Sequence, residues 1–237
     1  MKKLLLAGLI IFSAVLSYAQ KTINDPNAEV RAVSGFNAIH VSNSFQVYIT
    51  QSNEEALAVS SNHKEDMEKI VTRVENGVLK IYLDDKGKWW PKNRKLKAYI
   101  SVKEIKELRG SGATDFRIEG ELNAADLKLS LSGASDLKGK LVVSGKLSAN
   151  LTGASDISIS GSANELSVDA SGASDVKAYD FTTNICQVEA SGASGVKVTV
   201  NKELSAKLSG ASSVHYKGTA MIKDIRTSGA SNISKKS

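Results

Sequence analysis

Apolar and polar residues alternate along most of the chain, and the alternation recurs at a nearly constant interval. In the second half, three apolar positions separated by single polar residues lead into most copies of a short glycine motif, as in Leu127–Leu131 with the sequence LKLSL. A further apolar position follows every motif, at Phe116, Leu137, Ile157, Val176, Val196, Val214 and Ile233. Alternation with a period of two is typical of a strand with one buried face. Each unit is therefore predicted to be a strand, a glycine turn and a second strand.

The glycine motif, SGASD in its commonest form, occurs seven times. Its glycines are spaced 18 to 21 residues apart, at Gly112, Gly133, Gly153, Gly172, Gly192, Gly210 and Gly229. A unit of about 20 residues cannot bury its apolar face alone, so neighbouring units must stack. Parallel stacking at about 4.8 Å per coil predicts an all-β fold, a parallel β-solenoid or β-prism-like stack. Like residues then form columns, and stacked Ser hydroxyls can form hydrogen bonds along the axis.

The ends of this array differ from its middle. At the innermost strand position the first copy has Lys106 and the last has Lys223, which predicts charged ends that resist further pairing. Residues 36–103 lack the motif but contain several predicted strands and a hairpin turn at Asn76-Gly77. We therefore divide the chain into a linker over 20–35, an N-terminal β-subdomain over 36–103 and a seven-copy repeat region over 104–234.

The first nineteen residues have the pattern of a secretory signal peptide. Lys2 and Lys3 precede an apolar stretch from Leu4 to Leu16, and Ser17-Tyr18-Ala19 places small residues at the two positions that a signal peptidase reads. A retained transmembrane helix is the alternative, but the apolar run is shorter than the roughly 20 residues that span a bilayer. The mature chain is predicted to be exported to the periplasm, the outer surface or the extracellular space.

Composition and charge exclude several classes of protein. The formal charge of +6 falls to +4 without Lys2 and Lys3, and no nucleic-acid-binding motif accompanies it. A single cysteine, Cys186, excludes an internal disulfide framework and a cysteine-based zinc site, and its place in an inward column predicts a core residue. The three histidines lie in unrelated segments with no ligand spacing or nucleophile motif, so catalysis has little support.

These features together resemble a known family. The signal peptide, SGFNAI at 34–39, VYITQ at 47–51, NGVLKI at 76–81, the serial SGASD copies and YKG at 216–218 resemble the putative auto-transporter adhesin, head GIN domain family, whose function is unknown and which is common in exported Bacteroidota proteins. The chain departs from the family's frequent Gly-Ile-Asn tripeptide, where it has Asn43-Ser44-Phe45. The resemblance implies a two-part all-β architecture related to trimeric adhesin heads, and homo-oligomerisation through one face.

Four consecutive motifs end in aspartate, at Asp115, Asp136, Asp156 and Asp175. Carboxylates stacked about 4.8 Å apart repel one another unless they are neutralised, and Ca²⁺ is a suitable counter-ion in exported proteins. The same column continues as Gly195, Ser213 and Asn232, so the turn does not require a carboxylate. Asp and Asn at such positions commonly bond their own backbone and shape the turn. We favour this turn chemistry over metal binding and predict no obligatory cofactor.

A second candidate site is a basic loop that contains both tryptophans. Its proposed binding residues are Lys86, Lys88, Trp89, Trp90, Lys92 and Arg94. Exposed aromatic rings beside cations can stack on sugars or bind anionic glycans and lipid head groups. The alternative is a loop whose tryptophans cover an edge or open end of the core, as large aromatic residues more commonly do.

The sequence therefore predicts an exported, non-enzymatic, adhesin-like binding module of the cell envelope whose partner is a surface glycan or another envelope component. The alternatives are a β-helical carbohydrate-active enzyme acting on anionic polysaccharide and a purely structural envelope protein. Neither nucleic acid binding nor a membrane span in the mature chain is expected.

Overall fold

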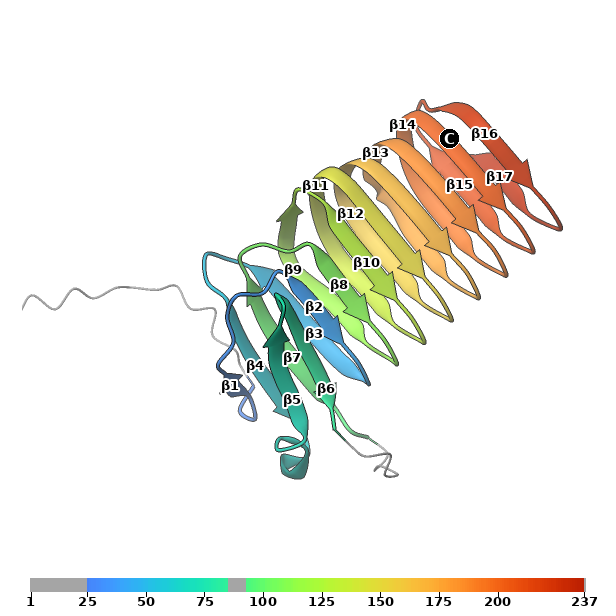
Figure 1. Cartoon of the computed structure of the whole chain (residues 1–237). Helices are drawn as coiled ribbons and strands as arrows, with labels where there is room; N and C mark the ends of the chain where they lie inside the picture. Colours follow the sequence, from blue (N-terminus) through green and yellow to red (C-terminus); the bar gives the residue numbers. More distant parts are fainter. Residues whose placement is uncertain (1–24, 85–92, 237) are drawn as a thin grey trace, which may run out of the picture.

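The computed structural model describes residues 25–84 and 93–236, and the structural statements below concern these residues. Their strands form an elongated stack of turns of chain that lie one upon another (Figure 1). The N-terminal part contains β1 (Glu29–Arg31), β2 (Ala38–Val41), β3 (Phe45–Gln51), β4 (Ala56–Ser61), the short 3₁₀ turn η1 (Lys64–Asp66), β5 (Ile70–Glu75), β6 (Val78–Leu83) and β7 (Leu96–Val102). The repeat region contains β8 (Glu107–Gly110), β9 (Asp115–Ala124), β10 (Leu127–Leu131), β11 (Asp136–Leu151), β12 (Asp156–Ala170), β13 (Asp175–Ala190), β14 (Gly195–Leu208), β15 (Ser213–Lys217), β16 (Met221–Thr227) and β17 (Asn232–Lys235).

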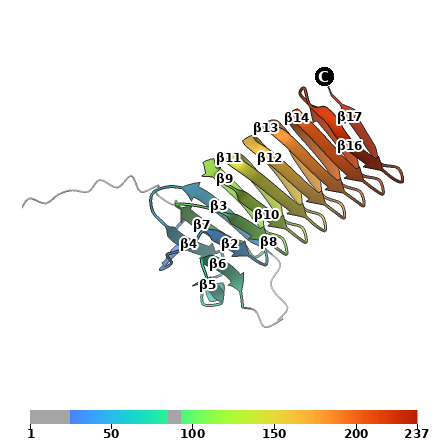
Figure 2. The same ribbon diagram turned by 45° about the horizontal axis from the view of Figure 1, so that its top comes forward.

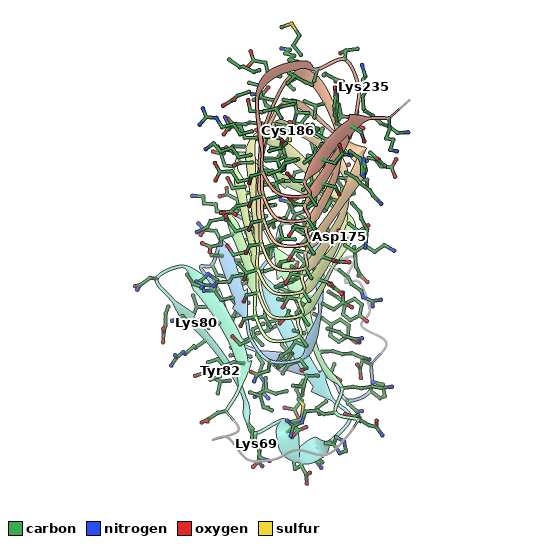
Figure 3. All side chains as sticks on the ribbon, turned by 90° about the vertical axis from the view of Figure 1, so that its right-hand side faces the viewer. Lys69, Lys80, Tyr82, Asp175, Cys186 and Lys235 are labelled. Carbon is green, nitrogen blue, oxygen red and sulfur yellow. The ribbon has the colours of Figure 1, made fainter. Side chains whose placement is uncertain are left out.

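The stack has two faces that meet at the glycine motif. The first face consists of the segments that lead into the motif: β6, β2, β8, β10, the second halves of β11 to β14, and β16. The second face consists of the segments that leave it: β7, β3, β9, the first halves of β11 to β14, β15 and β17. Neighbouring coils pair in parallel, as predicted, so the parallel β-solenoid is confirmed. The inward columns fill the space between the faces, where Cys186 stacks between Leu166 and Leu204 (Figure 3). Burial raises the pKa of its thiol to about 12.

The glycine corner repeats one pattern of hydrogen bonds. From the second motif onward the alanine N–H donates to the carbonyl of the preceding motif's glycine, for example Ala173 to Gly153 at 2.7 Å. The buried hydroxyl two residues after each glycine bonds the carbonyl of the motif's first residue, as Ser135 does to Ser132 at 2.8 Å. A buried serine hydroxyl also accepts the N–H of the serine below, as Ser155 does from Ser135 at 3.4 Å. The predicted bonding of stacked serines along the axis therefore runs from hydroxyl to backbone.

Parallel stacking begins before the first glycine motif. The turn between β2 and β3 lies under the first repeat turn, where the Ala113 N–H donates to the Asn43 carbonyl at 2.9 Å. Asn43 has a φ of 75°, close to the 81° of Gly112 above it. Asparagine is one of the few non-glycine residues that adopt this left-handed conformation readily. The Asn43-Ser44-Phe45 departure is thus a corner of the same stack, and parallel pairing runs across residue 104.

Antiparallel strands close the N-terminal end of the stack. β5 pairs with β6 through the predicted hairpin turn at Asn76-Gly77, whose φ angles are 51° and 77°. β4 pairs with β7, and β1 pairs with β4. The hairpin that contains Lys80 and Tyr82 stands beside the stack in Figure 3. Because β2 and β6 extend the first face beyond β8, Lys106 does not lie at an end of the stack. The prediction that Lys106 protects such an end from further strand pairing is wrong. No helix in the described part of the chain has the length and hydrophobicity to cross a membrane.

Candidate functional site

An open groove lies at the second corner of the stack, opposite the glycine motif. Its volume is about 1000 Å³, and it is lined by residues 104–106, residues 123–128 and four side chains between 142 and 148. These segments come from three successive coils, in the green part of the stack in Figure 1. We call this feature the corner groove. Its concave shape and the polar side chains that line it make it a candidate for a binding site.

The groove exists because the second corner changes along the stack. In the first two coils of the repeat region the chain leaves the sheet, between β7 and β8 and between β9 and β10. In the third coil β11 runs on continuously, with a shift of register between Val143 and Lys146. The Asp126 Oδ1 accepts the Lys146 N–H at 2.7 Å, and the Gly145 N–H donates to the Ala125 carbonyl at 2.7 Å. These bonds fix the wall of the groove to the neighbouring coil.

Three lysines, one from each coil, line the corner groove. The Lys106 side chain is exposed and its ammonium has no hydrogen bond or ion pair among the described residues. Lys128 lies 3.8 Å from Glu107, a long and exposed ion pair, whereas Lys146 pairs closely with Glu165 at 2.6 Å. Buried aliphatic side chains, including Leu127, lie beneath them. The groove therefore combines an apolar floor with cations that can accept an anion.

The aspartate column is present in the predicted register. Asp136 lies opposite Asp115 on one side and Asp156 on the other, and Asp175 continues the column on the second face (Figure 3). Asp115 binds Arg117 at 2.7 Å, and Asp156 binds Lys177 at 2.8 Å. The latter hydrogen bond raises the pKa of the Lys177 ammonium.

Backbone N–H groups also contact this column, but they belong to the next coil. The Asp136 Oδ1 accepts the Asp156 N–H, and the Asp156 Oδ1 accepts the Asp175 N–H, both at 3.3 Å. The carboxylates therefore link coils, whereas we expected them to bond within their own turn. No group of three potential metal-ligating side chains occurs within 25–84 and 93–236. Calcium binding at this column stays an untested alternative.

Most of the tryptophan loop lies outside the described residues, including Lys86, Lys88, Trp89, Trp90 and Lys92. Arg94 is described, and its guanidinium forms two hydrogen bonds with the buried carboxylate of Asp66, at 2.8 and 2.9 Å. Its side chain is only 12% exposed. The Arg94 guanidinium thus forms an ion pair with Asp66 of η1. In this position it already has a partner within the protein.

A column of aromatic and basic residues follows the second face. The rings of Tyr48 and Tyr99 stack 5.2 Å apart, and the Arg117 guanidinium lies 6.0 Å from the Tyr48 ring. Both faces of the Tyr48 ring are therefore covered by neighbouring coils. A sugar cannot stack on this ring without displacing one of them, so we assign these residues to packing between coils.

Sequence reasoning missed the corner groove for a structural reason. Its three lysines precede the next glycine of the motif by six, five and seven residues, and Lys128 pairs in register with Ser148 and Glu107 instead of the other two lysines. Aligning the repeats on glycine therefore separates the lysines into different columns. The signal that could reveal them is the irregular segment Asn123–Asp126, which interrupts the strand alternation.

The parallel pairing of the coils and the repeating corner define the protein as a parallel β-solenoid with an antiparallel N-terminal cap. The chain belongs to the family described as putative auto-transporter adhesin, head GIN domain, which matches residues 35–220. The resemblance seen in the sequence is thereby confirmed. Among curated proteins, none matches the chain.

Solved structures show the same fold. A putative adhesin from Bacteroides fragilis NCTC 9343 has 21% identity and a TM-score of 0.83, with 88% of this chain and 95% of that chain covered. A putative lipid binding protein from Parabacteroides distasonis ATCC 8503 has 22% identity and a TM-score of 0.67, with 90% and 98% covered. A putative adhesin from Parabacteroides merdae ATCC 43184 has 17% identity and a TM-score of 0.64, with 89% and 95% covered. These structures show the fold, and the description of the family is consistent with an adhesin-like module.

Proposed function

We propose that this protein is an exported, non-enzymatic, adhesin-like module that binds an acidic glycan of the cell envelope in the corner groove. The observation that supports this most directly is the set of three lysines that successive coils place along one open groove. Ammonium groups form charge-assisted hydrogen bonds with carboxylate and sulfate oxygens. Because the cations are distributed along the stack, they fit an extended polymer better than a single small anion.

The floor of the groove supports the same ligand class. Sugar rings present C–H surfaces as well as polar groups, and the half-buried side chain of Val142 and the aliphatic parts of the lysines offer apolar contact above the buried Ile105 and Leu127. Both Ile105 and Leu127 are anchored in the core, with 2% exposure each. Sites held on rigid elements lose little conformational entropy when they bind. The groove is therefore preorganised for a chain-like ligand.

The non-enzymatic part of the proposal rests on how the groove uses its acidic residues. A carbohydrate-active enzyme needs carboxyl groups that are free to transfer protons or attack the sugar. The Asp126 carboxylate accepts the backbone N–H of Lys146 and holds the groove wall. Glu104 is the other acidic residue that lines the groove. Export rests on the signal peptide predicted over 1–19, which lies outside the described residues.

Binding to polysaccharides of defined charge tests the proposal. Calorimetric titration of the secreted protein should detect binding to sulfated heparin or carboxylated polygalacturonate, and none to neutral dextran. The double variant Lys106→Gln, Lys128→Gln should weaken that binding at least tenfold. Lys138→Gln, Lys197→Gln is the matched control, since both lysines are exposed on the second face and have no ion pair among the described residues. Added salt should weaken binding because the contacts are exposed and electrostatic.

Three outcomes contradict the proposal. Equal losses of affinity in the two double variants would indicate that binding depends on the overall positive charge of the surface and not on the groove. A loss confined to Trp89→Ala, Trp90→Ala would place the site in the tryptophan loop. New reducing ends after incubation with either acidic polysaccharide would establish the enzyme alternative. Mass spectrometry of the secreted chain checks export separately, with cleavage expected after Ala19.

A further inference from the structure

The C-terminal end of the solenoid is left open. The last coil consists of β16 on the first face and β17 on the second, and no described strand lies beyond either of them (Figure 2). The inward columns continue into this coil and end at Ile222, Ile225 and Ile233. Ile222 is 49% exposed and Met221 is 73% exposed, the latter among the most exposed large apolar side chains described. The apolar interior therefore reaches solvent at this end.

The N-terminal end of the stack is closed by antiparallel strands. There, β5, β4 and β1 turn antiparallel to the stack and end the parallel pairing. The free edge of β5 carries Arg73 and Glu75, which are partly exposed. Charged residues on short antiparallel edges discourage further strand addition. The two ends are thus unlike each other, and among the described residues it is the C-terminal end at which the inward columns reach the solvent.

The edge of β16 has the order of residues that an antiparallel copy of itself requires. Along β16, Ile225 points inward, whereas Asp224 and Arg226 point outward. If two copies pair antiparallel with Ile225 opposite Ile225, each Asp224 lies opposite the partner's Arg226. Side chains directly opposite each other in an antiparallel pair lie on the same face, and opposite charges there are stabilising.

Neighbouring registers are less favourable for physical reasons. Shifting the pairing by one residue sets inward side chains opposite outward ones. Shifting the pairing by two residues, in one direction or the other, places Asp224 opposite Asp224 or Arg226 opposite Arg226. Like charges in direct opposition are destabilising. The charges of β16 therefore select one register with a two-fold axis at Ile225. This self-complementarity favours a second copy of the chain over an unrelated strand.

We propose that two copies of this protein associate through their C-terminal ends, with β16 pairing antiparallel to β16 across a two-fold axis at Ile225. The pairing joins residues 223–227 of one copy to residues 227–223 of the other, so it extends the sheet and covers Ile225 at its centre. A two-fold contact of identical surfaces is closed, so it produces dimers and no filament. The capped N-terminal ends then point outward at both ends of the dimer. This inference does not depend on the identity of the groove ligand.

A charge-swap experiment tests both the dimer and its register. Sedimentation equilibrium of the secreted protein should show a monomer–dimer equilibrium. Asp224→Arg places arginine opposite arginine, and Arg226→Asp places aspartate opposite aspartate, so each variant alone should dissociate at least tenfold more readily. An equimolar mixture of the two variants restores opposite charges at both positions. The mixture should therefore form a heterodimer with an affinity near that of the unaltered protein.

Arg73→Asp, on the edge of β5, is the matched control and should leave the dimer unchanged. Circular dichroism of each variant shows whether it is folded, and recovery in the mixture excludes misfolding as the cause of dissociation. A protein that stays monomeric at all accessible concentrations would overturn the proposal. Dimers that neither single charge variant weakens, or variants that do not recover on mixing, would overturn it as well.

Discussion

The glycine of each corner is required by the coil beneath it as well as by its own backbone angle. At Gly192 the φ of 71° lies in the left-handed region, and a Cβ added there would lie 2.5 Å from the Gly172 carbonyl oxygen. That carbonyl accepts the N–H of Ala193, so it cannot move away without loss of a corner hydrogen bond. Two constraints therefore act on one residue, and the repeat maintains both at every coil.

Substitution of alanine at Gly192 tests the second constraint. We expect Gly192→Ala to lower the free energy of unfolding by about 3 kcal/mol or more, from about 1–2 kcal/mol of backbone strain and an added steric clash. Gly120→Ala is the control, because Gly120 is also left-handed, with a φ of 81°, but nothing lies within 4 Å of its added Cβ. Denaturant unfolding of both variants measures the difference. If both variants lose the same free energy of unfolding, the close approach of the added Cβ to the coil beneath does not contribute to the destabilisation.

Features of the fold that repeat at one position in every coil can be predicted from the sequence, and features that differ between coils cannot. Period-two alternation and the repeated glycine fix the coil, the inward columns and the buried position of Cys186. Asn43 escaped notice as a corner because asparagine replaced the glycine by which corners are recognised. Lys106 was misplaced because the strands that extend the stack beyond it, β2 and β6, carry no motif. The corner groove depends on the length of three different corners, which no single column records.

At the scale of elements, one aspartate attaches the N-terminal segment to the stack. Asp25 precedes β1, and its carboxylate accepts hydrogen bonds from Lys97 at 3.0 Å and Tyr99 at 2.8 Å, both on β7. Burial alone would raise the pKa of the Asp25 carboxyl, but these hydrogen bonds and those of Asn27 and Ser60 lower it to about 2. The hydrogen bonds therefore favour the charged form in the folded protein.

This lowered pKa predicts an acid-dependent loss of stability. Because the folded pKa of about 2 lies below the usual 3.8, the contribution of Asp25 is complete above about pH 4 and disappears as the pH falls toward 2. We expect Asp25→Asn to cost about 1 kcal/mol at pH 7, with the difference from the unaltered protein shrinking between pH 4 and pH 2. Denaturant unfolding across this pH range measures it. Asp169→Asn, at an exposed position without a described ion pair, is the control, and its difference in stability from the unaltered protein should not shrink over this pH range. If the difference for Asp25→Asn stays constant with pH, the lowered pKa of Asp25 is not the cause of its contribution to stability.

At the scale of the whole molecule, each coil of the repeat region contacts chiefly its two neighbours. β12 pairs with β11 below and β13 above, and the inward columns continue through all three. The stability of such a stack is approximately the sum of coil and interface contributions. The adhesin-like module is thus an extended scaffold, in which the groove at one end of the repeat region and the open edge at the other are set by separate coils.

Removal of one complete coil tests this architecture. Deleting residues 153–171 joins Thr152 to Gly172 and recreates an intact motif, with β11 now able to pair with β13 in the register that each has with β12. We expect this variant to remain folded, with the same circular dichroism per residue and a lower free energy of unfolding. Deleting residues 156–165 is the control, because it leaves too few residues between two corners to close a coil, and it should expose the core and unfold the chain locally or entirely. Hydrogen exchange would then show protection on both sides of the full-coil deletion and its loss beside the half-coil deletion. If both deletions unfold the chain equally, the coils do not act as separable units, and the stack is stabilised by contacts longer in range than its nearest neighbours.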